Sequence, residues 1–179
     1  MRTIPREVQD FARIKDSFKL SEKQKSVLLG TLLGDGSLKR RGNYYRLHIK
    51  HSYKQISLVR YKREMFSNIT SMPIRVFFQK VKDKDYKFCE FVTLTHPEFS
   101  KYRKLFYRDK KKVILQKLKQ QFNNSLSLAM WFITDFKNTA NFQFADELKL
   151  ICHPLIRRMS WTTAVQSMPA FRSIRNVLA

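Results

Sequence analysis

The first clear pattern of apolar residues lies in SEKQKSVLLGTLLGDGSL, near the start of the chain. Its apolar positions recur at helical spacing and predict a helix over residues 21–35 that ends at Asp35. Gly30 and Gly34 lie four residues apart and therefore on one face of this helix. Because glycine has no side chain, another backbone can approach that face closely.

After this helix the spacing alternates between strand-like and helix-like. It predicts, in chain order, strands at 37–41 and 44–51 joined by Arg41-Gly42-Asn43, a helix at 53–69, strands at 73–81 and 86–95, and a helix from His96-Pro97-Glu98 to about Tyr107. The order over residues 21–107 is α-β-β-α-β-β-α. This order predicts an α+β fold in which helices cover one face of a four-stranded antiparallel sheet. The other face carries Lys and Arg and is expected to meet water or a ligand.

The whole chain divides into four predicted regions. Residues 1–20 form an N-terminal extension, and 21–107 form the unit just described. Residues 108–125 are a basic connector with some helical character. Residues 126–179 begin with LSLAMWFITDF, a second apolar helix that ends at Asp135. The residues after it have weaker patterning.

Charge narrows the function. The chain has 36 Lys+Arg against 14 Asp+Glu, a formal net charge of +22, while 43% of its residues are hydrophobic. The hydrophobic fraction is sufficient for a folded core. The net positive charge requires a polyanionic partner, which could be nucleic acid or an anionic membrane. No stretch approaches the ~20 apolar residues of a spanning helix. We expect a nucleic-acid partner and no membrane. We expect neither a secretory signal nor a transit peptide.

Two other chemistries are disfavoured. The two cysteines, Cys89 and Cys152, form no CxxC pair, and the four histidines have no metal-ligand spacing. A disulfide or zinc framework is therefore not expected, and a reducing compartment is the default.

The two predicted apolar helices each end in a single aspartate, Asp35 and Asp135. If these helices pack side by side through small residues, both acids project from the same end of the pair. Two carboxylates held together can bind a divalent metal ion, with phosphate oxygens completing the coordination sphere. Such an ion polarises a phosphate and activates water. This pairing predicts chemistry on a nucleic-acid backbone.

Three segments resemble the LAGLIDADG homing endonucleases. VLLGTLLGDGSL is similar to the motif that names the family, whose helix ends in a metal-binding acid. FVTLTHPEFSKYRKLFYRDKKKVIL is similar to the family's T-x-x-H-P-E segment, which is followed by Tyr and a basic Lys-Val-Ile-Pro block. LSLAMWFITDF resembles the second motif of the double-motif members. The match spans about residues 20–136 in the family's order and spacing.

This resemblance implies the LAGLIDADG fold, which is an αββαββα unit with a basic antiparallel β-saddle. It also implies an endonuclease activity. Asp35 and Asp135 match the catalytic, Mg²⁺-coordinating acids, and Lys112 matches a catalytic lysine near the cleaved phosphate. Gly30 and Gly34 match the helix interface. The implied protein is an intron-encoded endonuclease that cuts double-stranded DNA at a specific site. Such a protein would be encoded in an organelle, either a mitochondrion or a chloroplast. The alternative location is the bacterial cytoplasm.

The sequence also departs from the family. Thr134-Asp135-Phe136 stands where double-motif members have D-D-G, and Leu115 replaces the usual proline. Residues 136–179 are too few for a second complete αββαββα unit, so we expect an incomplete second unit. A monomer is expected, or a dimer if the incomplete unit requires one.

Strand alternation predicts which residues face the nucleic acid. They are Lys39, Arg41, Arg46, His48 and Lys50 on the first hairpin, and Arg75, Gln79 and Lys87 on the second. Arg, Lys and Gln suit base edges in the major groove, which admits a two-stranded β-ribbon. The aromatic residues of the second hairpin (Phe77, Phe78, Phe88, Phe91) and Trp131 are expected in the core.

Two other functions stay open at this point. One is an RNA maturase that assists group I intron splicing and binds intron RNA. The other is a degraded, non-cleaving DNA-binding relative. A β-ribbon fits the major groove of B-DNA better than the deep, narrow groove of A-form RNA, which favours DNA.

Overall fold

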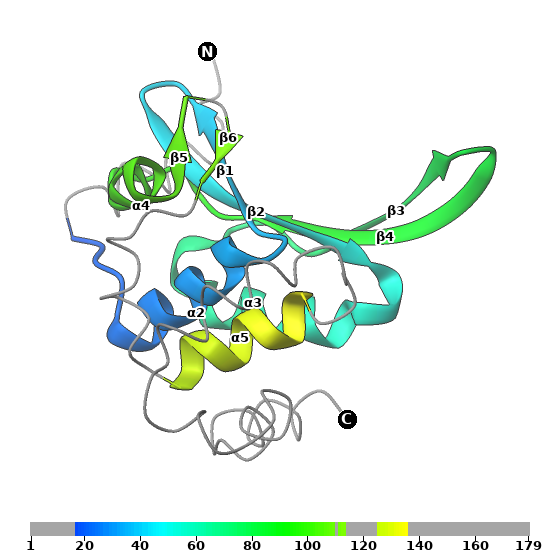
Figure 1. Ribbon diagram of the computed structural model, residues 1–179, viewed down its shortest axis with the longest axis horizontal. Coiled ribbons are helices and arrows are strands. Elements are labelled where there is room, and N and C mark those ends of the chain that lie inside the picture. Colours follow the sequence, from blue (N-terminus) through cyan, green and yellow to red (C-terminus); the bar gives the residue numbers. More distant parts are fainter. Residues whose placement is uncertain (1–16, 110, 114–124, 136–179) are drawn as a thin grey trace, which may run out of the picture. The chain divides into compact units, whose positions relative to one another are not determined.

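The computed structural model describes residues 17–109, 111–113 and 125–135, without the side chain of Asp135 (Figure 1). The elements that follow one another through residue 106 are α2 (Glu22–Leu33), β1 (Ser37–Arg41), β2 (Tyr44–Ser52), the 3-10 turn η1 (Tyr53–Gln55), α3 (Ile56–Met65), the 3-10 turn η2 (Ser67–Ile69), β3 (Arg75–Val81), β4 (Lys84–Val92) and α4 (Glu98–Phe106). They are followed by β5 (Tyr107–Arg108), β6 (Lys111–Lys112) and α5 (Ser125–Asp135). The predicted α-β-β-α-β-β-α order and the α+β class are confirmed.

The chain forms two compact units that interleave along the sequence. Among the described residues, the first combines 17–21 with Gly36–Lys104, and the second combines Glu22–Asp35 with those that follow from Leu105 to Asp135. The boundaries expected from chain order, at 20, 107 and 125, stay a prediction. The predicted extension up to residue 16 and the predicted shortened second unit beyond Asp135 lie outside the described residues.

The first unit is built on a four-stranded antiparallel sheet with the strand order β1-β2-β4-β3. Gly42 has a φ of +62° in the two-residue turn between β1 and β2, a conformation that glycine adopts without strain. Between β3 and β4 the turn residues are Lys82 and Asp83, with φ of 46° and 63°. This tight turn explains why β4 starts at Lys84, earlier than the predicted residue 86.

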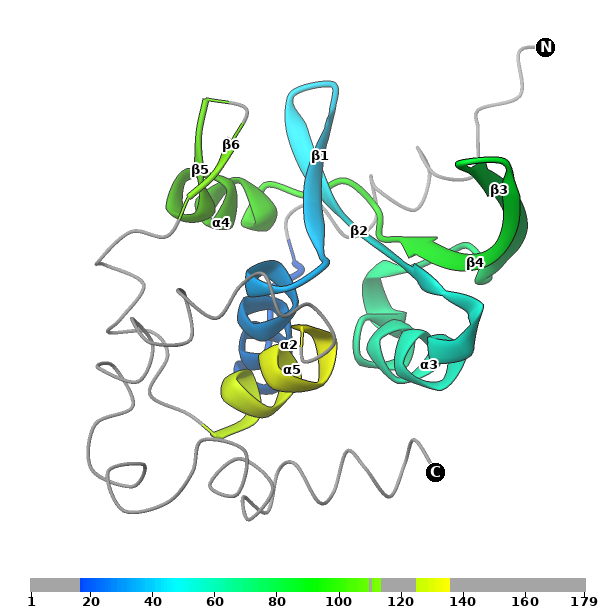
Figure 2. The ribbon, with the colours of Figure 1, turned by 45° about the vertical axis from the view of Figure 1, so that its right-hand side comes forward.

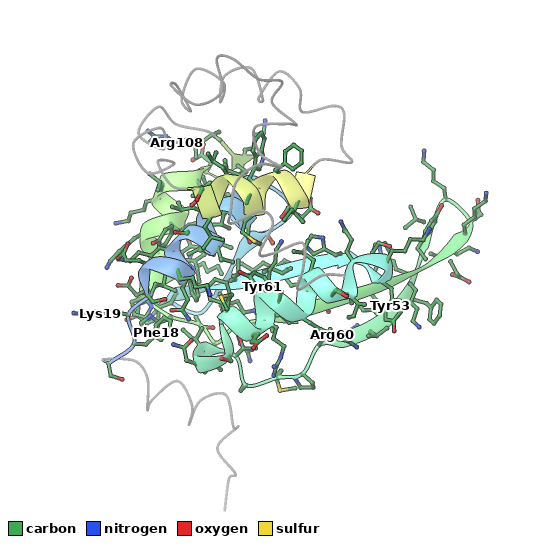
Figure 3. The ribbon with its side chains drawn as sticks, turned by 90° about the horizontal axis from the view of Figure 1, so that it is seen from below. Phe18, Lys19, Tyr53, Arg60, Tyr61 and Arg108 are labelled. Atoms are coloured by element: carbon green, nitrogen blue, oxygen red, sulfur yellow. The ribbon has the colours of Figure 1, made fainter. Side chains whose placement is uncertain are left out.

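One face of this sheet forms the core of the first unit. Leu47, Ile49 and Cys89 have no exposed surface, and Phe91 is also buried. Helix α3 packs against β2 and β4. Helix α3 has a buried and an exposed side, as the neighbouring residues Arg60 and Tyr61 show, the first exposed and the second buried (Figure 3). The burial of Leu47 and Ile49 confirms the alternation that the sequence predicts for β2.

A lysine is part of the same core. Lys62 of α3 is fully buried, and its Nζ lies 3.3 Å from Nε2 of His51. On the other side of that imidazole, Nδ1 lies 3.0 Å from Oε1 of Gln55. A buried amino group requires such polar contacts, because burial of a polar group without a hydrogen-bond partner is costly.

The second unit contains α2 and α5, which lie side by side (Figure 2). It also contains the hairpin of β5 and β6, in which Tyr107 pairs with Lys112 and Asp109 has a φ of 51° in the turn. The described part of the predicted connector therefore forms a hairpin, and the helical character predicted for residues 108–125 stays a prediction for the part outside the described residues. The left-handed backbone of Asp109 reverses the chain in this hairpin. Among the described helices, none has the length and apolarity needed to cross a membrane.

Candidate active site and nucleic-acid interface

The two glycines of α2 lie directly against α5. A Cβ placed on Gly30 would be 2.3 Å from the carbonyl oxygen of Ser127 and 2.7 Å from Cβ of Met130. A Cβ placed on Gly34 would be 2.6 Å from Cγ2 of Thr134. Because the contact moves towards the C-terminus on both helices together, α2 and α5 run parallel. Their C-terminal ends therefore lie at the same end of the pair.

The two motif acids occupy these helix ends. Asp35 follows Gly34 and is exposed, and Asp135 is the last residue of α5, directly after Thr134. Each acid is thus one residue beyond the contact between Gly34 and Thr134. The backbone brings the two positions to one end of the helix pair. That both carboxylates share a metal ion stays a prediction, because the side chain of Asp135 is outside the described atoms.

Lys112, the third predicted catalytic residue, reaches the same end of α2 from β6. Its Nζ donates a hydrogen bond of 2.8 Å to the carbonyl oxygen of Gly34. Carbonyls at the end of a helix carry partial negative charge, so an ammonium is stabilised there. The contact places a positive charge one residue away from Asp35.

Thr134 stands at the position where the chain departs from the resembled motif, which has an acid there. Its hydroxyl donates a hydrogen bond of 2.6 Å to the carbonyl oxygen of Met130, and its methyl group contacts Gly34. The residue is buried. Thr134 therefore packs the helix interface, and the interface is closed without a second acid at this position.

The donor chemistry at the helix ends fits Mg²⁺. This ion is commonly held by one or two carboxylates, with waters and phosphate oxygens in the remaining positions. Across the described part of the chain, no group of three or more His, Cys, Asp or Glu residues could hold a metal ion. That Asp35 and Asp135 hold such an ion stays a prediction.

The predicted nucleic-acid contacts lie on the sheet of the first unit. Directly opposed residues in antiparallel strands point to the same side. The register pairs Lys39 with Arg46, Arg41 with Tyr44, and both Lys50 and Arg75 with Glu90. The side of the sheet that this register defines is here called the basic face; its predicted members are Lys39, Arg41, Arg46, His48, Lys50, Arg75 and Gln79.

Lys87 does not belong to the basic face, so grouping it with the other contacts was wrong. It pairs with Phe78, and both point to the opposite side of the hairpin. There its Nζ lies 4.0 Å from the ring centroid of Tyr53. Phe78 is 69% exposed, so its predicted core position was also wrong, whereas Phe91 is buried as predicted. The pairing between β3 and β4 decides this orientation, and the alternation within a single strand does not show it.

The sequence reasoning missed Glu90, an acid on the basic face. Its Oε2 lies 3.0 Å from Nε2 of His48, and its Oε1 lies 3.6 Å from the guanidinium of Arg75. Burial lowers the pKa of His48 below its ordinary value of 6.5, and the hydrogen bond to Glu90 opposes this shift only in part. His48 is therefore mainly uncharged near pH 7. The position of Glu90 between the apolar Cys89 and Phe91 was the available signal.

Comparison with known proteins identifies the family. The model of the LAGLIDADG DNA endonuclease family matches residues 25–155, and the chain belongs to this family. The family expected from the three sequence segments is confirmed.

Individual relatives cover the chain only in part. It is 32% identical over 120 residues to Protein RecA of Mycolicibacterium flavescens, which is 65% of this chain and 26% of that protein. It is 27% identical over 129 residues to Protein RecA of Mycolicibacterium chitae, which is 70% of this chain and 29% of that protein. The chain thus spans less than a third of the length of these relatives.

A solved structure shares the fold. The homing endonuclease I-WcaI bound to its DNA recognition sequence superimposes with a TM-score of 0.65 at 22% sequence identity. The match covers 75% of this chain and 59% of that one. At this level of identity the likeness establishes the α+β fold.

Proposed function

We propose that the chain is a site-specific, Mg²⁺-dependent endonuclease of double-stranded DNA. The observation that carries the proposal is the parallel packing of α2 and α5, which brings Asp35 and Asp135 to one end of the helix pair. Lys112 is hydrogen-bonded at that end. Membership of a DNA endonuclease family supports the reaction class.

Each residue of the helix ends has a separate task in this proposal. Asp35 and Asp135 hold the ion, which when bound polarises the phosphate and activates water. The ammonium of Lys112 stabilises negative charge that develops on the phosphate. Gly30 and Gly34 let the helices approach, and so they set the separation of the two acids.

The basic face supplies recognition. Its Arg, Lys and Gln side chains match the acceptors and donors that guanine and adenine present in the major groove. The net charge of +22 attracts the phosphates and makes binding strongly dependent on salt. We therefore place binding and cleavage on different sets of residues, which mutations can separate.

The binding test uses the purified chain and a pool of duplexes with randomised centres, in EDTA. We expect the chain to retain a defined duplex sequence. If the pool yields no preferred sequence, or if structured intron RNA displaces the selected duplex, site-specific DNA recognition is refuted.

The cleavage test adds Mg²⁺ to the selected duplex. Asp35→Asn and Asp135→Asn should bind as wild type and lose cleavage, whereas the control Asp109→Asn, at an exposed acid in the β5–β6 turn, should cut normally. Lys112→Ala should slow cleavage by about 100-fold. Its matched control is Lys111→Ala, the exposed neighbour in β6, which should not. Cleavage by Asp35→Asn at the wild-type rate would contradict the assignment of the acids.

We further propose that the gene lies in an intron of an organellar or bacterial genome. The natural target is then the uninterrupted locus. The sequence selected from the pool should match the joined flanks of the intron, and an unrelated sequence would argue against this origin.

A further inference from the structure

Two aromatic rings interrupt the basic face. Phe77 of β3 and Phe88 of β4 are directly paired, with ring centroids 6.0 Å apart and planes inclined by 28°. They are on the side of Arg75 and Gln79, because residues two apart in a strand point the same way. Both rings are only half-buried. The prediction that they belong to the core was therefore wrong.

Polar side chains surround this pair. Lys50 Nζ lies 4.4 Å from the ring centroid of Phe88 and 5.2 Å from that of Phe77. The guanidinium of Arg75 lies 4.8 Å from the ring centroid of Phe77. Lys50 also donates a hydrogen bond to Oε1 of Gln79. Cation–π attraction holds the two cations over the rings. Because both rings are only half-buried, part of their apolar surface is exposed beside the two cations and the amide of Gln79.

The chemistry of the major groove gives this surface one fitting ligand. In the major groove every base presents hydrogen-bond donors or acceptors, and thymine also presents an apolar C5-methyl group. An aromatic surface cannot satisfy a donor or an acceptor, so it would penalise those groups and accept the methyl. The framing side chains suit the neighbouring bases, since Lys and Arg match guanine and Gln matches adenine.

We propose that Phe77 and Phe88 read the 5-methyl group of a pyrimidine, which in ordinary DNA is thymine. The proposal deepens the DNA-binding function and rests on it. It makes the aromatic pair a determinant of specificity, with Lys50, Arg75 and Gln79 reading the adjoining base pairs. Burial of one methyl group contributes about 0.8 kcal/mol. Since 1.4 kcal/mol is tenfold in affinity, the methyl should change the dissociation constant by about fourfold.

The test uses the wild-type chain and the duplex selected in EDTA. Each thymine is replaced in turn by 2′-deoxyuridine, which removes only the methyl group. We expect one or two positions at which this replacement weakens binding about fourfold. At such a position, a C·G pair should bind about fourfold better when its cytosine carries a 5-methyl group. If no thymine is sensitive to loss of its methyl, the inference is overturned while the DNA-binding proposal stands.

Protein variants assign the effect to the two rings. Phe88→Ala and Phe77→Ala should bind the thymine and deoxyuridine duplexes equally, and Phe88→Leu, which keeps an apolar surface, should retain discrimination. The matched control is Phe78→Ala, since Phe78 is 69% exposed on the opposite side of the same hairpin. Full discrimination by folded Phe77→Ala and Phe88→Ala would overturn the inference. Failure to select any duplex would overturn the proposed function, and this inference with it.

Discussion

Replacement of Gly30 by alanine tests the helix contact on which the proposed active site depends. The new Cβ would lie 2.3 Å from the carbonyl oxygen of Ser127, 2.7 Å from Cβ of Met130 and 2.9 Å from the backbone nitrogen of Trp131. Two of these atoms are backbone, and the third is a Cβ. No rotamer change can move them aside, so the helices themselves must separate. An ordinary contact distance requires a shift of about 1 Å.

The size of the effect follows from two destabilising contributions and one that opposes them. Overpacking of a tight interior contact costs about 1–3 kcal/mol, and occasionally more. Alanine gains up to about 1 kcal/mol over glycine in a helix. Separating α2 from α5 also loosens the buried side chains of Leu128, Met130 and Trp131. We expect Gly30→Ala to lower the free energy of unfolding by about 1–3 kcal/mol.

Urea denaturation followed by circular dichroism measures this loss. With a dependence of about 2 kcal/mol per molar urea, the midpoint should fall by about 1 M. Lys23→Ala is the matched control, because Lys23 is exposed on the same helix and its replacement should change stability by only a few tenths of a kcal/mol. A Gly30→Ala variant as stable as wild type would refute the close helix contact.

Three further predictions concern other contacts. Gly34→Ala should destabilise the chain and Thr134→Ser should partly rescue it, because serine lacks the Cγ2 that lies 2.6 Å from the added Cβ; a double-mutant cycle in urea measures the coupling. Replacing Lys82-Asp83 by Asn-Gly should raise the thermal midpoint, since both residues have positive φ and Asn-Gly suits such turns; an unchanged or lower midpoint would contradict the strain. His48 has a folded-state pKa below 6.5, so its stabilisation is present above that pH and is lost as pH falls through the folded pKa. His48→Gln should flatten this loss in denaturation curves measured between pH 7 and pH 5, and an unchanged slope would argue against it.

The helix–strand order was predictable because each segment has its own period. Residues 21–35 repeat at helical spacing, residues 44–51 alternate, and the glycine at position 42 marks the turn between strands. The family followed from three motifs in a fixed order. These signals are local, and local pattern is what a single sequence displays directly.

The orientation of the second hairpin was not predictable in the same way. Val76, Phe77 and Phe78 are consecutive apolar residues, and such a run does not indicate which side faces the core. Only the pairing of Phe77 with Phe88 decides it, and it leaves Phe78 and Lys87 on the other side. A shift of one residue exchanges the two faces of a strand. The same limit applies to Lys62, whose burial depends on a contact with His51 from another element.

The pairing of α2 with α5 has a consequence for biosynthesis. Helix α2 is complete at Leu33, but α5 begins only at Ser125. At about 5–20 residues per second, a ribosome needs roughly 5–20 s to add the intervening residues. During that interval the side of α2 that meets α5, with its glycines and leucines, has no α5 to pack against. Exposed apolar surface of this kind attracts chaperones and promotes aggregation. Nascent chains stalled before Ser125 should therefore bind chaperones more strongly than chains stalled after α5 has left the ribosome.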